Sequence, residues 1–252
     1  MAADRGELMR LHRVFVSELK PEVWLSPSES HHLKQVLRVK LGQKLIVFNG
    51  KGLEAEAEVS ELEGLKLALC LGEIKASDVE SAWRLILALS LLKGDKFADV
   101  IRQGTELGVV GFIPVLSQYC DVREFKEGRL ERYKRIAQEA SKQCGRSLIP
   151  DIYPLHQLAD LIHLPADLKL VAHPYSHLTL SESLAGYEVD KTLDILCLTG
   201  PEGGFSPKDL ENLKLESSEI HSFKAIQLGK RILRAETAPI ALASAILLPQ
   251  GL

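Results

Sequence analysis

A glycine-rich segment follows an apolar run in the second half of the chain: residues 198–207 read LTGPEGGFSP. An apolar strand is expected to end at Leu198, and Ser206 and Pro207 are expected to cap and open a helix. Glycines allow the backbone to approach a ligand closely, and the Glu202 carboxylate could accept hydrogen bonds from ligand hydroxyl or amine groups. The pattern predicts either a ligand loop at the carboxyl end of a parallel strand or a tight turn with no ligand.

A second segment, residues 228–239, carries three cations and one carboxylate directly before a long apolar stretch. The charged residues are Lys230, Arg231, Arg234 and Glu236. Backbone amides at the start of a helix, together with Arg231 and Arg234, favour an anion. The alternative is a solvated basic turn, but this density of charge before an apolar helix favours a functional one.

Residues 93–96 (KGDK) and 105–108 (TELG) flank another expected helix. Ordinary capping explains Asp95 at its start and Gly108 after its end. Capping does not explain Glu106, which is expected near a neighbouring strand.

Two further segments are rich in charge. Residues 123–146 hold eight basic and four acidic side chains, which is typical of a solvated helix face, although the polar end at 141–146 could line a groove. His31 and His32 have no further metal ligands at a matching spacing. Contact with phosphate or RNA is the more economical interpretation, because cations follow at Lys34, Arg38 and Lys40.

The apolar pattern predicts two scaffolds for these segments. Residues 11–80 alternate short apolar runs with glycine turns, and residues 54–59 alternate with period two, as a half-exposed strand does. One short amphipathic helix is expected within residues 31–40. Several short strands with one helix predict a small β-barrel.

From Trp83 onward, apolar runs alternate with longer helical segments, which predicts an α/β fold with a parallel sheet covered on both faces. Strands are expected within residues 85–92, 109–116, 168–172 and 195–198. Helices are expected within residues 95–107, 130–144, 207–215 and 235–247. The change of pattern at residues 76–82 predicts two domains, residues 1–80 and residues 81–252.

The overall composition excludes several classes of protein. The 252 residues include 31 Lys and Arg against 34 Asp and Glu, a formal net charge of −3, which is ordinary for a folded chain and argues weakly against nucleic acid. The common dinucleotide, NTPase, serine hydrolase and zinc protease motifs are absent from the sequence. Four scattered cysteines without a CxxC pair predict reduced, buried thiols. No signal peptide or membrane span is visible, which predicts a cytoplasmic protein.

Six segments, taken in order, resemble the RsmE family, the small-subunit (16S) ribosomal RNA uridine N3-methyltransferases of the SPOUT class. The resemblance runs from about Arg13 to the C-terminus, and six motifs in the family order make it specific. The segments are His32-x-x-x-Val36-Leu37-Arg38, Lys93-Gly94-Asp95-Lys96, Thr105-Glu106-Leu107-Gly108, Gln143-Cys144-Gly145-Arg146, Gly200-Pro201-Glu202-Gly203-Gly204 and Leu228-Gly229-x-Arg231-Ile232-Leu233-Arg234-x-Glu236-Thr237-Ala238.

The resemblance implies an N-terminal PUA-like β-barrel that binds RNA and a C-terminal α/β methyltransferase domain with a trefoil knot. It implies S-adenosylmethionine as the methyl donor, bound in the knot, and a homodimer whose interface completes each site. The implied reaction is methylation of N3 of a specific uridine in 16S ribosomal RNA of the small subunit. No metal and no membrane partner are implied.

The resemblance also implies a role for individual residues. Arg234 would stabilise the uridine anion, and Glu236 would orient the base or take its proton. The cofactor pocket would be lined by Leu198, Thr199, Gly200, Glu202, Gly203, Leu228, Gly229, Ile232 and Leu233. RNA would be held by Arg13, His32, Arg38 and Arg146.

The chain departs from the family pattern at two places. Arg102-Gln103 stand where the family usually has Gln-Lys, and Tyr119 stands where it often has Arg. The first change moves a cation and the second removes one, so both bear on RNA contacts. Two alternatives remain open, a methyltransferase of the same class acting on another RNA or base, and a nucleotide-binding module without catalysis. Retention of Arg234 and Glu236 speaks against the second.

The neutral total charge conceals strong segregation along the chain. Residues 1–52 hold nine basic and five acidic side chains, residues 53–80 hold two and eight, and residues 224–234 hold four and none. The positive segments are those expected to contact RNA and to form the active site. We therefore expect RNA binding to be local and salt-sensitive.

Overall fold

The computed structural model describes residues 11–64, 66–126, 128–215 and 222–251. The chain forms two compact units. The first runs up to Glu80 and also includes Gln138–Ile149, and the second holds Ser81–Ala137 and the chain from Pro150 onward. Each unit is described by itself below.

The first unit contains a five-stranded sheet, in the order β1-β3-β4-β5-β2, within the described residues. β1 is parallel to β3, and the other pairs are antiparallel. The elements of this unit are β1 (Arg13–Phe15), β2 (Glu22–Trp24), α2 (Pro27–His31), the π-helix η1 (His32–Val36), β3 (Lys44–Phe48), β4 (Leu53–Glu63) and β5 (Lys66–Ala76). The period-two prediction for residues 54–59 is confirmed, because Ala55, Ala57 and Val59 are buried in the core while the glutamates between them are exposed.

The helix expected within residues 31–40 is wrong in its bounds. α2 begins at Pro27, with the Ser26 hydroxyl as its cap, and η1 ends at Val36. Leu33 packs into the core as expected, but Val36 is largely exposed. Arg38 then adopts a left-handed backbone with φ of 53°, which a continuing helix does not allow.

Residues 138–149 belong to the first unit although they are remote from it in sequence. They include the end of α4 (Arg129–Cys144) and the loop that follows. The backbone amide of Ile149 donates to Gly50 O at 3.0 Å, and the amide of Gly52 donates to Ser147 O at 3.0 Å. This segment is therefore held to the β3–β4 turn by backbone hydrogen bonds.

The second unit is built on a parallel sheet in the order β12-β10-β11-β6-β7-β8, with β9 paired to β7. Its strands are β6 (Trp83–Ser90), β7 (Gly111–Leu116), β8 (Asp151–Ile152), β9 (His156–Gln157), β10 (Leu168–Ala172), β11 (Leu193–Thr199) and β12 (Lys224–Ile226). Its helices, apart from α4, are α3 (Lys96–Glu106), η2 (Leu158–His163), α5 (Leu180–Leu184), α6 (Pro207–Asn212), α7 (Thr237–Leu247) and η3 (Leu248–Gly251). The predicted α/β class with a mostly parallel sheet is confirmed.

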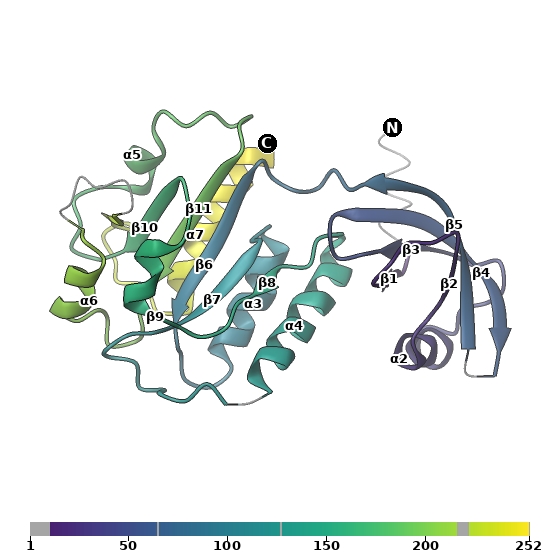
Figure 1. Cartoon of the computed structure of the whole chain (residues 1–252). Coiled ribbons are helices and arrows are strands. Elements are labelled where there is room, and N and C mark those ends of the chain that lie inside the picture. Colours follow the sequence, from purple (N-terminus) through teal and green to yellow (C-terminus); the bar gives the residue numbers. More distant parts are fainter. Residues whose placement is uncertain (1–10, 65, 127, 216–221, 252) are drawn as a thin grey trace. The chain divides into compact units, whose positions relative to one another are not determined.

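Both faces of the central strands are buried, as the continuous apolar runs indicated. On β11, Leu196 and Leu198 belong to one core cluster, which also contains Leu161 of η2 and Leu213 after α6. α7 lies against β6 and β11 and also contacts α3 (Figure 1). α3 packs closely because Gly104 has no side chain: a Cβ there would lie 2.8 Å from the Phe112 ring.

Several local predictions for the second unit are confirmed. Ser206 caps α6 in a reciprocal pair with Asp209, and Pro207 is the first helical residue. Gly108 follows α3 with φ of 99°, in the left-handed region. Asp95 precedes α3 but makes no capping hydrogen bond, because its carboxylate pairs with Arg132 at 2.8 Å.

The four cysteines are free, as predicted, but they are not all buried. Cys120 and Cys197 are buried, whereas Cys70 is exposed on β5 and Cys144 is partly exposed. The described helices include none that is long and apolar enough to cross a membrane.

Candidate functional site

The carboxyl ends of β12, β10, β11 and β6 lie side by side, because these strands are adjacent and parallel. The chain leaves β6 toward β7 on one side and returns to β11 on the other, which makes this edge a switch point of the kind where α/β sheets bind ligands. A pocket of about 730 Å³ lies at this edge. Its lining comes from the ends of the strands and the loops that follow them, and from the first turns of two helices. These residues are Ala172 to Tyr175 at the end of β10, Thr199 to Phe205 at the end of β11, Leu228, Gly229 and Arg231 to Glu236 after β12, Lys96 of α3 and Ala238 of α7.

The loop after β11 is shaped by its glycines. A Cβ on Gly200 would lie 3.1 Å from the Phe205 ring, and one on Gly203 would lie 3.2 Å from Cβ of Tyr119. Gly204 has φ of 71°, which side chains rarely adopt. These glycines bring bare backbone to the pocket wall, where a ligand can approach peptide groups directly.

A buried carboxylate fixes the end of this loop. Asp209 accepts hydrogen bonds from the backbone amide and the hydroxyl of Ser206, each at 2.9 Å. Asp209 also accepts from the backbone amide of Gln118 at 3.3 Å, and Oγ of Ser206 lies 2.8 Å from Oε1 of Gln118. The glycine-rich loop is thereby tied to the loop after β7, which carries Tyr119.

The loop after β12 presents its side chains outward. Gly229 turns the chain with φ of 80°. The carbonyl oxygen of Arg234 accepts hydrogen bonds from the amides of Thr237 and Ala238, at 2.9 and 3.0 Å, where α7 begins. The Arg234 side chain is 85% exposed, so its guanidinium is available at the mouth of the pocket.

Lys96 joins the two loops through their carboxylates. Its Nζ lies 2.9 Å from Oε1 of Glu202 and 3.2 Å from Oε2 of Glu236. These two carboxylates raise the pKa of Lys96 above its ordinary value. Burial acts to raise the pKa of Glu202, but hydrogen bonds from Lys96 and from backbone amides outweigh it and lower that pKa overall. Nη1 of Arg234 lies 4.0 Å from Oε1 of Glu236, so two cations and two anions meet at the pocket.

The structure brings together most of the residues predicted for the cofactor and for catalysis. Those that line the pocket are Thr199, Gly200, Glu202, Gly203, Leu228, Gly229, Ile232, Leu233, Arg234 and Glu236. Leu198 is not among them, because its side chain is fully buried in the core between the sheet and η2. Sequence reasoning missed His173, Pro174 and Tyr175, although their position directly after the strand 168–172 was a signal for them.

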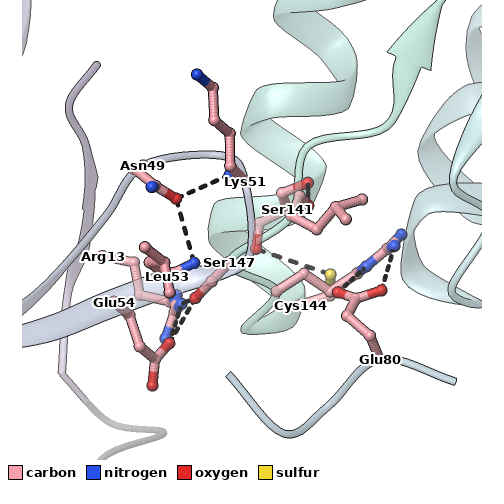
Figure 2. Close-up of polar contacts among 11 residues, drawn as sticks. Arg13, Asn49, Lys51, Leu53, Glu54, Glu80, Ser141, Cys144 and Ser147 are labelled. Atoms are coloured by element: carbon pink, nitrogen blue, oxygen red, sulfur yellow. Dashed lines mark hydrogen bonds and ion pairs between the residues drawn. The ribbon is translucent and has the colours of Figure 1, made fainter. Parts of the chain in front are cut away.

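The predicted RNA-binding residues divide into two pairs in the first unit. His32 and Arg38 are exposed. Arg13 is enclosed: its Nη2 donates to Oε2 of Glu54 at 2.8 Å and to Oγ of Ser147 at 2.6 Å (Figure 2). Arg146 is also enclosed, with its side chain 5% exposed and paired to Glu80. The first pair is free to meet RNA, whereas the charges of the second pair are already neutralised within the protein.

The positions that depart from the family pattern lie on the surface of the second unit. Arg102 pairs with Asp99 at 2.7 Å along α3, and Gln103 is exposed beside it. Tyr119 is about half exposed, and its backbone and Cβ lie against Gly203.

The pocket fits a cofactor that has both polar and apolar parts. Oγ1 of Thr199 is buried and has no hydrogen-bond partner among the described residues, so it can serve a ligand. The glycine loops leave peptide groups accessible, and Leu228 and Leu233 supply apolar wall. No cluster of side chains that could hold a metal ion occurs among the described residues.

The sequence matches two protein families. Residues 79–247 match the RNA methyltransferase domain family, and residues 25–70 match the RNA methyltransferase PUA domain family. The chain is 31% identical to the ribosomal RNA small subunit methyltransferase E of Rickettsia conorii, over 92% of this chain and 93% of that protein. It is 28% identical to the enzyme of the same name from Bacillus subtilis, over 94% and 96% of the two chains.

A solved structure is similar in fold. The ribosomal RNA small subunit methyltransferase E of Neisseria gonorrhoeae, crystallised with S-adenosylmethionine bound, has a TM-score of 0.83 and 30% identity, over 95% of this chain and 98% of that one. The fold, the two family matches and the relatives agree with the motifs in the sequence. The chain therefore belongs to the ribosomal RNA small subunit methyltransferase E family.

Proposed function

We propose that this protein transfers a methyl group from S-adenosylmethionine to N3 of a specific uridine in 16S ribosomal RNA. The observation that carries the proposal is the pocket at the carboxyl ends of β11 and β12, where Arg234 and Glu236 stand beside the glycine-rich loop. The Neisseria gonorrhoeae relative, of the same fold, is a small-subunit ribosomal RNA methyltransferase crystallised with this cofactor.

The residues present suit this cofactor. When bound, S-adenosylmethionine supplies a methyl group on a positively charged sulfur, whose carbon–sulfur bond breaks with the electron pair left on sulfur. The peptide groups of Gly200, Gly203 and Gly229 and the hydroxyl of Thr199 would hold its polar parts. The Leu228, Ile232 and Leu233 side chains would cover its apolar parts, and Glu202 suits its hydroxyl or amine groups.

Two side chains carry the chemistry on the RNA. N3 of uridine is a weak acid, so it reacts well only when its proton is removed or its developing charge is stabilised. Glu236 accepts that proton or orients the base, and Arg234 stabilises the negative charge that develops on the uracil ring. The target base leaves its stack to reach this pocket.

RNA is held by the first unit in this proposal. His32 and Arg38 are exposed and contact the RNA directly. Arg13 and Arg146 support the same unit from within, because their guanidiniums are paired with Glu54 and Glu80.

We also propose that two copies of the chain assemble into a dimer. The second unit of each copy would have the trefoil knot of the family, and the protein would act in the cytoplasm. The apolar side chain of Ile232 at the pocket is 77% exposed, and Leu248 after α7 is more than half exposed. A second copy covering such side chains removes apolar surface from water. Sedimentation of the purified protein measures this: a monomer at all concentrations contradicts the dimer.

The function is tested by mapping methylated uridines in 16S ribosomal RNA from a strain without this protein. One N3-methylated uridine disappears and returns when the gene is restored, but not when an Arg234→Ala gene is restored. An unchanged methylation pattern contradicts the substrate assignment. Titration calorimetry of the purified protein with S-adenosylmethionine tests the cofactor separately, since no heat of binding contradicts the enzyme assignment.

A further inference from the structure

Lys96 occupies an unfavourable place for a cation. It is the first residue of α3, an eleven-residue helix whose N-terminus carries partial positive charge. Helix formation therefore gives no reason for a lysine here. Its side chain reaches instead to the carboxylates of Glu202 and Glu236, at 2.9 and 3.2 Å.

These three side chains come from three separate connections of the sheet. Lys96 follows β6, Glu202 follows β11 and Glu236 follows β12. Two carboxylates facing one pocket repel each other, and the ammonium between them offsets that repulsion. Lys96 thus holds the two cofactor loops in a fixed relation through charge.

The Glu236 carboxylate depends most on this contact. Its Oε2 is buried and makes no hydrogen bond within the described residues, and the ammonium of Lys96 lies 3.2 Å away. Its Oε1 lies 4.0 Å from the guanidinium of Arg234, beyond hydrogen-bond distance. One oxygen is therefore held, and the other stays available for a proton.

We propose that Lys96 is a positioning residue for the methyl transfer: it holds Glu236, through Oε2, in the orientation in which Oε1 accepts the proton from N3 of the target uridine. Glu202 anchors Lys96 from the opposite side. The proton leaves N3 as the new nitrogen–carbon bond forms, and it ends on the Glu236 carboxylate. This inference rests on the proposed function, because it assigns a role within that reaction.

The test compares three variants under saturating cofactor and RNA. Lys96→Met removes the charge, and Lys96→Arg keeps it. Lys93→Met is the matched control, because Lys93 lies in the same turn but pairs with Asp121 at 2.8 Å. For each variant, kcat, KM for RNA, the S-adenosylmethionine affinity by calorimetry and the thermal midpoint are measured.

We expect Lys96→Met to lower kcat on the order of 10- to 100-fold. This is less than the roughly 100- to 10,000-fold that a positioned base contributes, because Glu236 itself is retained. Lys96→Arg should keep kcat within about threefold, because it restores the charge next to Glu236. KM for RNA should stay near the parent value in Lys96→Met, and a weaker cofactor affinity would not lower kcat because the cofactor is saturating. The Lys93→Met variant should match the parent in all four measurements.

A second substrate separates proton transfer from simple loss of structure. RNA transcribed with 5-fluorouridine carries a more acidic N3, because fluorine withdraws electrons from the ring, so it needs a base less. This RNA should restore most of the kcat lost in Lys96→Met, and also that lost in Glu236→Gln. A structural defect would not be restored.

Parent-like kcat in Lys96→Met overturns the inference, as does a kcat loss that 5-fluorouridine leaves unchanged. If Lys96→Met proves unstable, the Lys96→Gln variant is put through the same comparison, with the same outcomes. A parent protein that methylates no small-subunit RNA contradicts the proposed function instead, so the two failures are distinguishable.

Discussion

Arg146 donates to both carboxylate oxygens of Glu80: its Nε lies 2.9 Å from Oε1 and its Nη2 lies 2.6 Å from Oε2. This paired geometry is the strongest arrangement that an arginine and a carboxylate can form. Both side chains are largely buried, and each compensates charge on the other. The pair holds the loop after α4 to the end of the first unit.

Glu80→Ala should destabilise the first unit, because it leaves the Arg146 guanidinium buried without this carboxylate. Breaking a buried pair from one side costs about 3 kcal/mol or more. Urea unfolding followed by circular dichroism measures the change. The control is Glu18→Ala, which breaks an exposed pair with Lys20 and should leave the unfolding midpoint where it was. Equal effects of the two substitutions would argue against this account.

Gly203→Ala should weaken binding of S-adenosylmethionine about tenfold. This corresponds to a loss of roughly 1.4 kcal/mol in the free energy of binding. The new Cβ would lie 3.2 Å from Cβ of Tyr119, so the glycine-rich loop must move away from its position at the pocket. Calorimetry measures the affinity. Gly72→Ala serves as the control, since its Cβ would meet a backbone oxygen at an ordinary 3.4 Å, far from the pocket loops in sequence. Unchanged affinity in Gly203→Ala would show that the loop tolerates a side chain.

The acid stability of the protein should depend on Glu202. Burial raises its pKa, but the hydrogen bond from Lys96 and backbone amides outweigh this and lower the pKa below 4.5. A carboxyl with a lowered folded-state pKa stabilises the fold above its ordinary pKa, and this contribution is lost as the pH falls through the folded value. Thermal midpoints from pH 6 downward should therefore fall less steeply in Glu202→Gln than in the parent. Parallel curves would contradict the contribution of Glu202.

Arg38→Ala should affect RNA binding, whereas Arg13→Ala should affect the stability of the fold. Arg38 is exposed, so its removal should weaken RNA binding and reduce the salt dependence by about one phosphate contact, with an unchanged thermal midpoint. Arg13 is paired with Glu54 and Ser147, so its removal should lower the thermal midpoint by about 4 °C or more.

Filter binding at several salt concentrations and calorimetric melting make this comparison. Lys75→Ala, which removes an exposed cation from β5, is the control for non-specific loss of charge. If Arg13→Ala changes only RNA affinity, the guanidinium reaches RNA despite its enclosure.

Much of the fold could be predicted from local patterns. The alternation at residues 54–59 indicated β4, and the apolar runs at 85–92 and 195–198 indicated β6 and β11. Short strands such as β12 were missed, because three residues are too few to show a period. The helix bounds near Val36 were wrong, since spacing alone does not reveal the left-handed turn at Arg38.

The candidate site was predicted only in part, because some of its contacts join residues far apart in the sequence. Glycine-rich loops can be recognised in the sequence, because their composition is unusual. The contact of Lys96 with Glu202 and Glu236 spans more than 100 residues and depends on strand order. The same holds for Arg13 and Arg146, whose basic character indicated RNA but whose partners Glu54 and Glu80 became visible only in the fold.

The inclusion of residues 138–149 in the first unit has a consequence for how such a protein can be rearranged by recombination. A single crossover near residue 80 would join the N-terminal part of one parent protein to the C-terminal part of another. Residues 138–149 would then come from a different parent than the rest of the first unit. The hybrid would inherit Glu54 and Glu80 from one parent and Ser147 and Arg146 from the other. The two halves are therefore expected to be inherited together, although each has a core of its own.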